Sequence, residues 1–175
     1  MTNPRATSES VLALFATEGH RFSARNLATA AHRAVKLRRH DLRRDRRMMA
    51  LADTARSRLE AFNCQELANT AWAFATAGVE AHALFNAIAD AARPQLGKFN
   101  SQDLANTAWA FATAGVEAHA LFNAIADAAR PQLGKFNSQE LANTAWAFAT
   151  ARVEALDLFN AIADAARPQL GKFTS

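Results

Sequence analysis

The stretch FNCQELANTAWAFATAGVEAHALFNAIADAARPQLGK, from Phe62 to Lys98, decides the fold because it occurs three times. The second copy covers residues 99–135 and the third covers residues 136–172, so the period is 37 residues. The first two copies differ at two positions and the last two differ at four. A period of this length is typical of an array in which each unit buries its apolar surface against its neighbours.

Each copy predicts two helices. Asn63 is a suitable N-cap for the first helix, and Glu66 follows at the position of a capping-box partner. Gly78 suits the position after this helix, where a left-handed backbone is needed, although the third copy has Arg152 there. A second helix is expected over residues 80–92, ending before Pro94. One such hairpin cannot cover its own apolar faces, so stacking of the copies is expected.

The first 61 residues contain a worn version of the same unit. Phe22 to His32 aligns with Phe62 to Trp72 at an offset of 40 residues, and the second half aligns at an offset of 37. Residues 22–61 therefore form a diverged first repeat with a longer internal connection, as is expected of a terminal repeat. Residues 1–21 are expected to form a tail and a capping helix, from Ser10 to about Gly19, capped by Thr7 or Ser8.

These patterns predict an all-α fold. We expect a right-handed α-solenoid of stacked helical hairpins, made of one diverged and three near-identical repeats, with residues 173–175 as the start of a truncated fifth repeat. The alanine-rich composition without tyrosine favours helix over sheet. No apolar run approaches the roughly 18 residues of a membrane span, and the single Cys64 cannot form a disulfide within the chain.

The sequence contains no motif of an enzyme. A glycine-rich phosphate loop, a nucleophile with its base and a plausible pair of carboxylates are all missing. His82 and His119 have no second ligand at metal spacing, so they are expected to be surface or partly buried residues. We therefore expect no enzymatic activity, no cofactor, no bound metal and no membrane contact.

Positive charge is concentrated in the diverged repeat. Residues 1–61 hold 13 Lys and Arg against 6 Asp and Glu, whereas residues 62–175 hold 7 against 10. The segment RRHDLRRDRR supplies six of the arginines: Arg38, Arg39, Arg43, Arg44, Arg46 and Arg47. One interpretation is a solvated helix start or loop, and the other is a patch that contacts nucleic-acid phosphates. Basic residues before a helix oppose the helix dipole, so local stability does not account for them.

Three side-chain rows recur at the period of the repeat. The tryptophan row, Trp72, Trp109 and Trp146, flanks the apolar arc of the first helix, so we interpret it as core packing rather than a base-stacking platform. The asparagine row, Asn69, Asn106 and Asn143, falls on the exposed arc, where amides could contact base edges. Its alternative is a hydrogen bond to a neighbouring backbone or layer. Lysines at the repeat junctions could meet phosphates: Lys98, Lys135 and Lys172. Against RNA, Glu66, Asp103 and Glu140 are placed on the same face as the amides.

The segments FNSQELANTAWAFATAG and ALFNAIADAARPQL resemble the octotricopeptide and heptatricopeptide repeats of organellar proteins. The resemblance covers residues 62–172 strongly and 22–61 weakly. It implies an α-solenoid that binds single-stranded RNA in mitochondria or chloroplasts and acts in RNA stability, processing, translation or ribosome assembly. The N-terminal residues contain no clear targeting peptide. The alternative is a protein-binding or structural scaffold without direct RNA contact.

Overall fold

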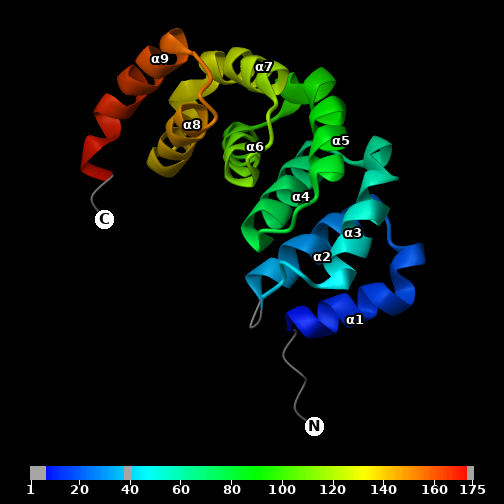
Figure 1. Ribbon diagram of the computed structural model, residues 1–175. Helices are drawn as coiled ribbons and strands as arrows, with labels where there is room; N and C mark the ends of the chain where they lie inside the picture. Colours follow the sequence, from blue (N-terminus) through cyan, green and yellow to red (C-terminus); the bar gives the residue numbers. More distant parts are fainter. Residues whose placement is uncertain (1–6, 38–40, 173–175) are drawn as a thin grey trace.

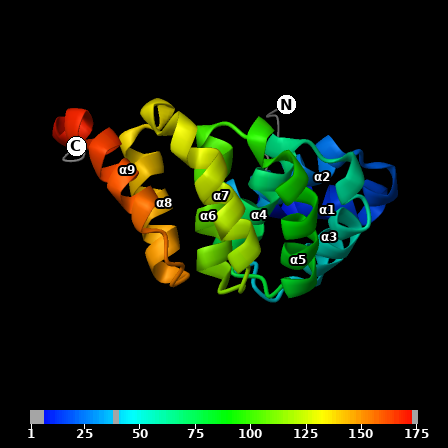
Figure 2. The ribbon, with the colours of Figure 1, turned by 90° about the horizontal axis from the view of Figure 1, so that it is seen from above.

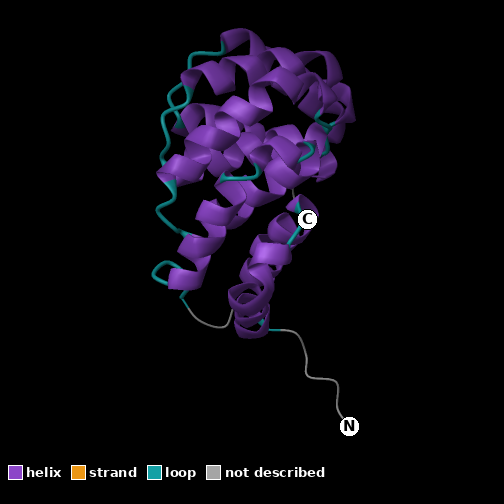
Figure 3. Ribbon diagram, turned by 90° about the vertical axis from the view of Figure 1, so that its right-hand side faces the viewer, coloured by secondary structure: helices purple, strands orange, loops and turns teal. Residues whose placement is uncertain are grey.

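All regular structure in the protein is helical over the residues that the computed structural model describes, 7–37 and 41–172 (Figure 3). The α-helices are α1 (Ser8–Glu18), α2 (Ala24–Lys36), α3 (Arg46–Arg56), α4 (Cys64–Ala77), α5 (His82–Ala92), α6 (Ser101–Ala114), α7 (His119–Ala129), α8 (Ser138–Thr150) and α9 (Leu156–Ala166). Short 3-10 turns follow α1 and the second helix of each pair: Gly19–Arg21, Leu59–Ala61, Arg93–Lys98, Arg130–Lys135 and Arg167–Lys172. The expected fifth-repeat residues, 173–175, lie outside the described part.

The helices form two rows along an arc (Figure 1). The first helices of the pairs, α2, α4, α6 and α8, pack on one another in chain order on the inner side of the arc. The second helices, α3, α5, α7 and α9, lie on the outer side, where α7 and α9 contact the 3-10 turn of the preceding pair. Figure 2 shows the pairs following one another in sequence order. Helix α1 packs against α2 and α3 at the N-terminal end.

The predicted capping boxes are present at the start of every regular first helix. The side chain of Asn63 accepts a hydrogen bond from the backbone N–H of Glu66 at 2.9 Å, and the Glu66 carboxylate accepts one from the backbone N–H of Asn63 at 2.9 Å. The same exchange joins Asn100 to Asp103 and Asn137 to Glu140. These bonds satisfy N–H groups that a helix leaves without partners, so the repeat sets its own helix starts.

The first helices also end as expected. Gly78 and Gly115 adopt φ values of 66° and 65°, and Arg152 adopts 53° at the corresponding position. The second helix begins at His82 instead of residue 80. Val79 and Ala81 form the connection instead, because the N–H of Ala81 donates to the carbonyl oxygen of Val79 at 2.9 Å and the Val79 side chain is buried. At the N-terminal end, α1 starts at Ser8 with Thr7 as its cap.

The core runs the length of the arc between the two rows. On each regular first helix, a leucine, an alanine and a phenylalanine recur on the core side, and in α4 these are Leu67, Ala71 and Phe74, which are fully buried; α2 has Ala34 in place of the phenylalanine. Between pairs, the Phe85 ring of α5 meets the Phe111 ring of α6 edge to face, with ring centroids 5.1 Å apart. Consecutive pairs are therefore joined by the same aromatic contact at a 37-residue spacing, since Phe122 meets Phe148 in the same way.

Candidate nucleic-acid interface

One stripe of each first helix faces the inner side of the arc. Residues separated by four, three and four positions fall within about 60° of one another around a helix of 3.6 residues per turn. In α4 these residues are Gln65, Asn69, Trp72 and Thr76. They lie opposite Leu67, Ala71 and Phe74, which are fully buried. The equivalent of Phe74 in α6, Phe111, meets Phe85 of the outer helix α5. We call this set of residues, and its equivalents in the other first helices, the inner stripe.

The inner stripe repeats in all four first helices. Its members in α6 and α8 are Gln102, Asn106, Trp109 and Thr113, and Gln139, Asn143, Trp146 and Thr150. In the diverged helix α2, the offset of 40 residues places Arg25, Thr29, His32 and Lys36 there. All of these side chains are exposed or half-buried. The structure thus brings the predicted asparagine row onto one surface with the tryptophan row, and it adds two cations at the N-terminal end.

The amides of the asparagine row are open to a ligand. Asn69, Asn106 and Asn143 are half-buried, and within the described part of the chain none of the three side chains makes a hydrogen bond. The neighbouring polar row behaves differently, because buried Thr70 donates its hydroxyl to the Glu66 carbonyl oxygen at 2.7 Å, as its equivalents do in α6 and α8. Among the described residues, no bond joins these amides to the backbone or to a neighbouring layer.

The tryptophans of the inner stripe differ in how much of each side chain is buried. Trp72 and Trp109 are half-buried against the core, and Trp146 is 46% exposed. The Trp109 and Trp146 rings have centroids 6.4 Å apart, and His32 lies 5.2 Å from Trp72. Core packing accounts for only part of the Trp72 and Trp109 indoles, and the exposed Trp146 lies on the surface that carries the amides.

The acidic residues of the first helices lie beside the inner stripe, and their carboxylates accept hydrogen bonds in the capping boxes. Glu66, Asp103 and Glu140 each accept the backbone N–H of an N-cap residue in the capping boxes. Asp103 is 6% exposed, and this burial raises the pKa of its carboxyl group, opposed by the hydrogen bond from the Asn100 backbone. Their negative charge is therefore held at the helix starts, where it favours the helix dipole.

Four arginines of the predicted cluster lie in the described part of the chain, and they differ in their contacts. Arg43, Arg44 and Arg46 are exposed in the α2–α3 connection and at the start of α3, whereas Arg38 and Arg39 lie outside the described residues. Arg47 instead binds Glu9 of α1, with nitrogen–oxygen distances of 2.5 and 2.8 Å, and binds the Asp45 carboxylate at 2.7 and 3.0 Å.

The bonds to Glu9 and Asp45 give Arg47 a role in holding the structure together. The hydrogen bonds that Arg47 donates to Glu9 and Asp45 raise the pKa of its guanidinium above the usual value. They also join α1 to the start of α3, since Glu9 belongs to the first turn of α1. Arg47 is therefore less available to a phosphate than the three exposed arginines beside it.

The predicted junction lysines lie near the N-terminal ends of the first helices, whereas the arginines of the α2–α3 connection follow the C-terminal end of α2. Lys98 and Lys135 are exposed at the ends of 3-10 turns, two residues before the N-caps of α6 and α8. The side chain of Lys172 is outside the described residues. The structure thus places the exposed arginines of the connection and the junction lysines at opposite ends of the helices, with the inner stripe running between them.

Sequence reasoning missed the cations of the inner stripe itself. Arg25 and Lys36 occupy stripe positions in α2, and Arg33 is exposed beside them. A hollow of about 340 Å³ between α2 and α4 is lined in part by Arg25, Arg33 and Asn69. The signal was in the sequence, because the alignment that pairs His32 with Trp72 also pairs Arg25 with Gln65 and Lys36 with Thr76.

His32 adds a titratable group to this hollow. Burial lowers the pKa of its imidazole below the ordinary value, and the positive charges of Lys36 and Arg33 lower it further. The ring also lies against Trp72, so His32 contributes an aromatic face as well as a titratable nitrogen. Near neutral pH it is therefore an uncharged member of the stripe.

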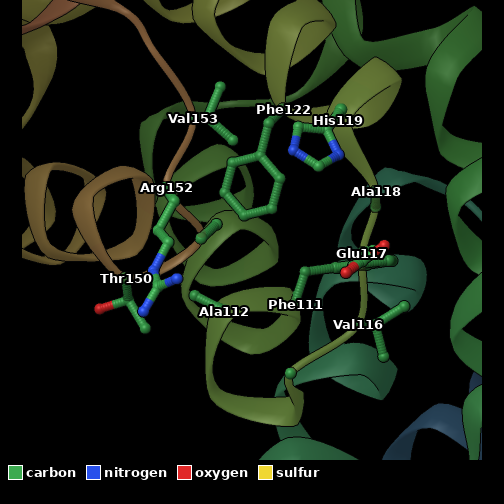
Figure 4. A pocket seen from close by; sticks show the side chains of 12 residues that line it. Phe111, Ala112, Val116, Glu117, Ala118, His119, Phe122, Thr150, Arg152 and Val153 are labelled. Atoms are coloured by element: carbon green, nitrogen blue, oxygen red, sulfur yellow. The ribbon is translucent and has the colours of Figure 1, made fainter.

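Two further hollows lie at the hairpin connections, 37 residues apart. The one shown in Figure 4 has a volume of about 290 Å³ and lies between the α6–α7 and α8–α9 connections, with Phe122 and His119 on its wall. Its equivalent, of about 230 Å³, contains His82 and is also lined by Arg43. Both histidines are exposed, as expected. No group of three or more metal-ligating side chains occurs among residues 7–37 and 41–172.

A family model described as the Tbc2 translation factor, N-terminal domain, matches residues 5–175, which is nearly the whole sequence. No curated protein matches the chain. Among the helices that the structure describes, none combines the length and the apolar character needed to cross a membrane.

Proposed function

The chain belongs to the family of the Tbc2 translation factor, N-terminal domain, and from this membership we propose that it binds single-stranded RNA along the inner stripe. The description of the family indicates a role in translation. In this proposal the arc is a right-handed α-solenoid of four stacked hairpins of the octotricopeptide or heptatricopeptide type. The mitochondrion or chloroplast, as the place where the protein acts, comes from that resemblance.

The observation that carries the proposal is the row of three half-buried amides without a hydrogen bond inside the described chain. Each amide can donate and accept a hydrogen bond at the same time, and the edge of an unpaired base presents both acceptors and donors. Asn69, Asn106 and Asn143 belong to consecutive first helices, and consecutive helices pack about 8–10 Å apart. A single strand crossing the first helices would meet one amide per layer, which is how helical-repeat proteins read RNA.

Positive charge for the phosphates is supplied from the N-terminal end. Arg25 and Lys36 belong to the inner stripe, and Arg43, Arg44 and Arg46 are exposed at the nearby connection. Lys98 and Lys135 are exposed at the junctions of the regular repeats. We therefore expect binding that is steered to the diverged repeat and weakened by salt, because each phosphate contact releases counterions.

A titration with labelled single-stranded RNA homopolymers at several salt concentrations tests the proposal. The variant Arg25→Gln/Lys36→Gln removes two stripe cations, and the matched control Arg93→Gln/Arg130→Gln removes two cations of the outer row. Arg93 and Arg130 form exposed ion pairs with Asp90 and Asp127, whose loss has little effect on stability.

Two lost phosphate contacts should reduce the slope of log K against log salt by about 1.4 for a single strand. The control should leave this slope unchanged. Equal effects of the two variants would overturn the assignment of the stripe. No RNA binding by the wild-type chain would leave the protein-binding scaffold as the remaining function.

A further inference from the structure

We propose that the tryptophan row is a stacking platform for the bases of the bound strand. This inference rests on the proposed function, because it assigns a second contact to the same strand. All three tryptophans of the chain belong to this row; Trp72 and Trp109 are half-buried against the core, and Trp146 is 46% exposed. An indole held in this way offers a rigid aromatic surface that is already fixed before the ligand binds.

The tryptophans lie over the seams between consecutive pairs. In α6, Ala105 and Ala112 are buried on the side that packs against α8, whereas the equivalent Ala142 and Ala149 of α8 are exposed because α8 is the last first helix described. Trp146 is adjacent to this open side and is 46% exposed. A base that stacks on the row would therefore lie at the boundary between two layers.

The spacing of the rings fits this use. The centroids of Trp109 and Trp146 are 6.4 Å apart, and the ring planes are inclined by 34°. A base between two parallel rings needs about 7 Å, which is twice the rise of about 3.4 Å between stacked bases. A small rotation of the exposed Trp146 indole would thus admit a base between the two rings.

Each tryptophan is also paired with an amide of the same helix. Asn106 and Trp109 are three residues apart on α6, so their side chains are neighbours on one face of the helix. A base stacked on Trp109 would present its edge near the Asn106 amide. The two rows together give every regular layer one surface for the face of a base and one group for its edge, and His32 extends the aromatic row into α2.

The test uses the intrinsic fluorescence of the full chain, because its only tryptophans are those of the row. The probes are a single-stranded RNA and an abasic strand with the same sugar-phosphate backbone and label. Binding of each probe is measured independently by the anisotropy of its label. Trp146→Ala removes the most exposed indole, and Leu156→Ala is the control because Leu156 is a large apolar side chain, 74% exposed, on the outer helix α9.

We expect the RNA, but not the abasic strand, to quench the fluorescence. Trp146→Ala should weaken binding of the RNA about tenfold, as is typical when a stacking aromatic is replaced. It should leave binding of the abasic strand unchanged, and Leu156→Ala should affect neither. Binding of RNA by anisotropy without quenching, or equal loss for both probes in Trp146→Ala, would overturn the stacking platform alone. No binding of either probe would overturn the proposed function as well.

Discussion

Arg152 adopts the same left-handed backbone conformation that Gly115 adopts one repeat earlier, with φ of 53° against 65°. The turn around it is preserved, because the N–H of Val153 still donates to the Phe148 carbonyl oxygen, as the N–H of Val116 does to that of Phe111. The surrounding repeat therefore imposes a conformation on Arg152 that a side chain disfavours.

Replacing Arg152 with glycine should stabilise the protein. The left-handed conformation costs a residue with a side chain about 1 kcal/mol, a cost that glycine does not have. Urea unfolding should show a corresponding gain for Arg152→Gly and a loss of about 1 kcal/mol for the reverse change, Gly115→Ala. A Cβ at Gly115 would contact nothing within 4 Å, so the stability lost in Gly115→Ala measures the cost of the backbone conformation alone. No gain for Arg152→Gly would show that the last turn is not strained.

Removing a phenylalanine that joins two helix pairs should lower the free energy of unfolding more in the middle of the array than at its end. Phe122 is buried and meets Phe148 at 5.1 Å, whereas its equivalent Phe159 is only half-buried in the last pair. Phe122→Ala should therefore lower the free energy of unfolding by about 3–5 kcal/mol. Phe159→Ala should have a clearly smaller effect in the same denaturant titration. Equal losses would mean that stability does not depend on stacking between pairs.

The pKa of His32 predicts how stability changes with acidity. Its pKa in the folded protein is lowered by burial, Lys36 and Arg33, whereas in the unfolded chain it is ordinary, about 6.5. As pH falls below about 6.5, the unfolded state binds the proton first, so the free energy of unfolding should decrease until pH passes below the folded pKa.

The variant His32→Gln isolates this contribution. Between pH 7.5 and pH 5, it should lose less stability than the wild type in matched urea titrations. An identical pH dependence for His32→Gln and the wild type would contradict the lowered pKa.

The helices and their ends could be predicted from the sequence, because local rules decide them. The pairing of Asn63 with Glu66, the left-handed Gly78 and the break at Pro94 each involve residues within one or two turns of the chain. Identical copies then repeat the same local structure.

The surface of the first helix was harder to predict, because neighbouring helices decide it. A single helical wheel places Ala73 on the exposed arc, but it is fully buried. Trp72 falls at the edge of the apolar arc on the same wheel, yet only one side of it packs against the core. Neighbouring first helices on both sides of α4 and α6 bury two further sides of each, so only a narrow stripe of these helices remains open.

Ion pairs between residues far apart in the sequence also could not be predicted from local sequence patterns. Arg47 was grouped with the other arginines of its segment, but Glu9, 38 residues earlier, supplies its partner. By contrast, the stripe cations Arg25 and Lys36 could have been found by extending the alignment of residues 22–32 with residues 62–72. In this chain, the position of a charged residue within the repeat predicts its place on the surface better than the density of charge along the sequence does.

The central claim is that the asparagine row reads the strand, and the most direct test is the affinity of the variant Asn69→Ala/Asn106→Ala/Asn143→Ala for single-stranded RNA. Its control is Asn86→Ala/Asn123→Ala/Asn160→Ala, which removes the three exposed amides of the outer helices. With a net contribution of about 0.5–1.5 kcal/mol per hydrogen bond, the inner variant should bind at least about tenfold more weakly at fixed salt, with an unchanged salt slope. The outer control should bind as the wild type does. Equal affinities of the inner variant and the wild type, with both chains folded, would contradict the claim.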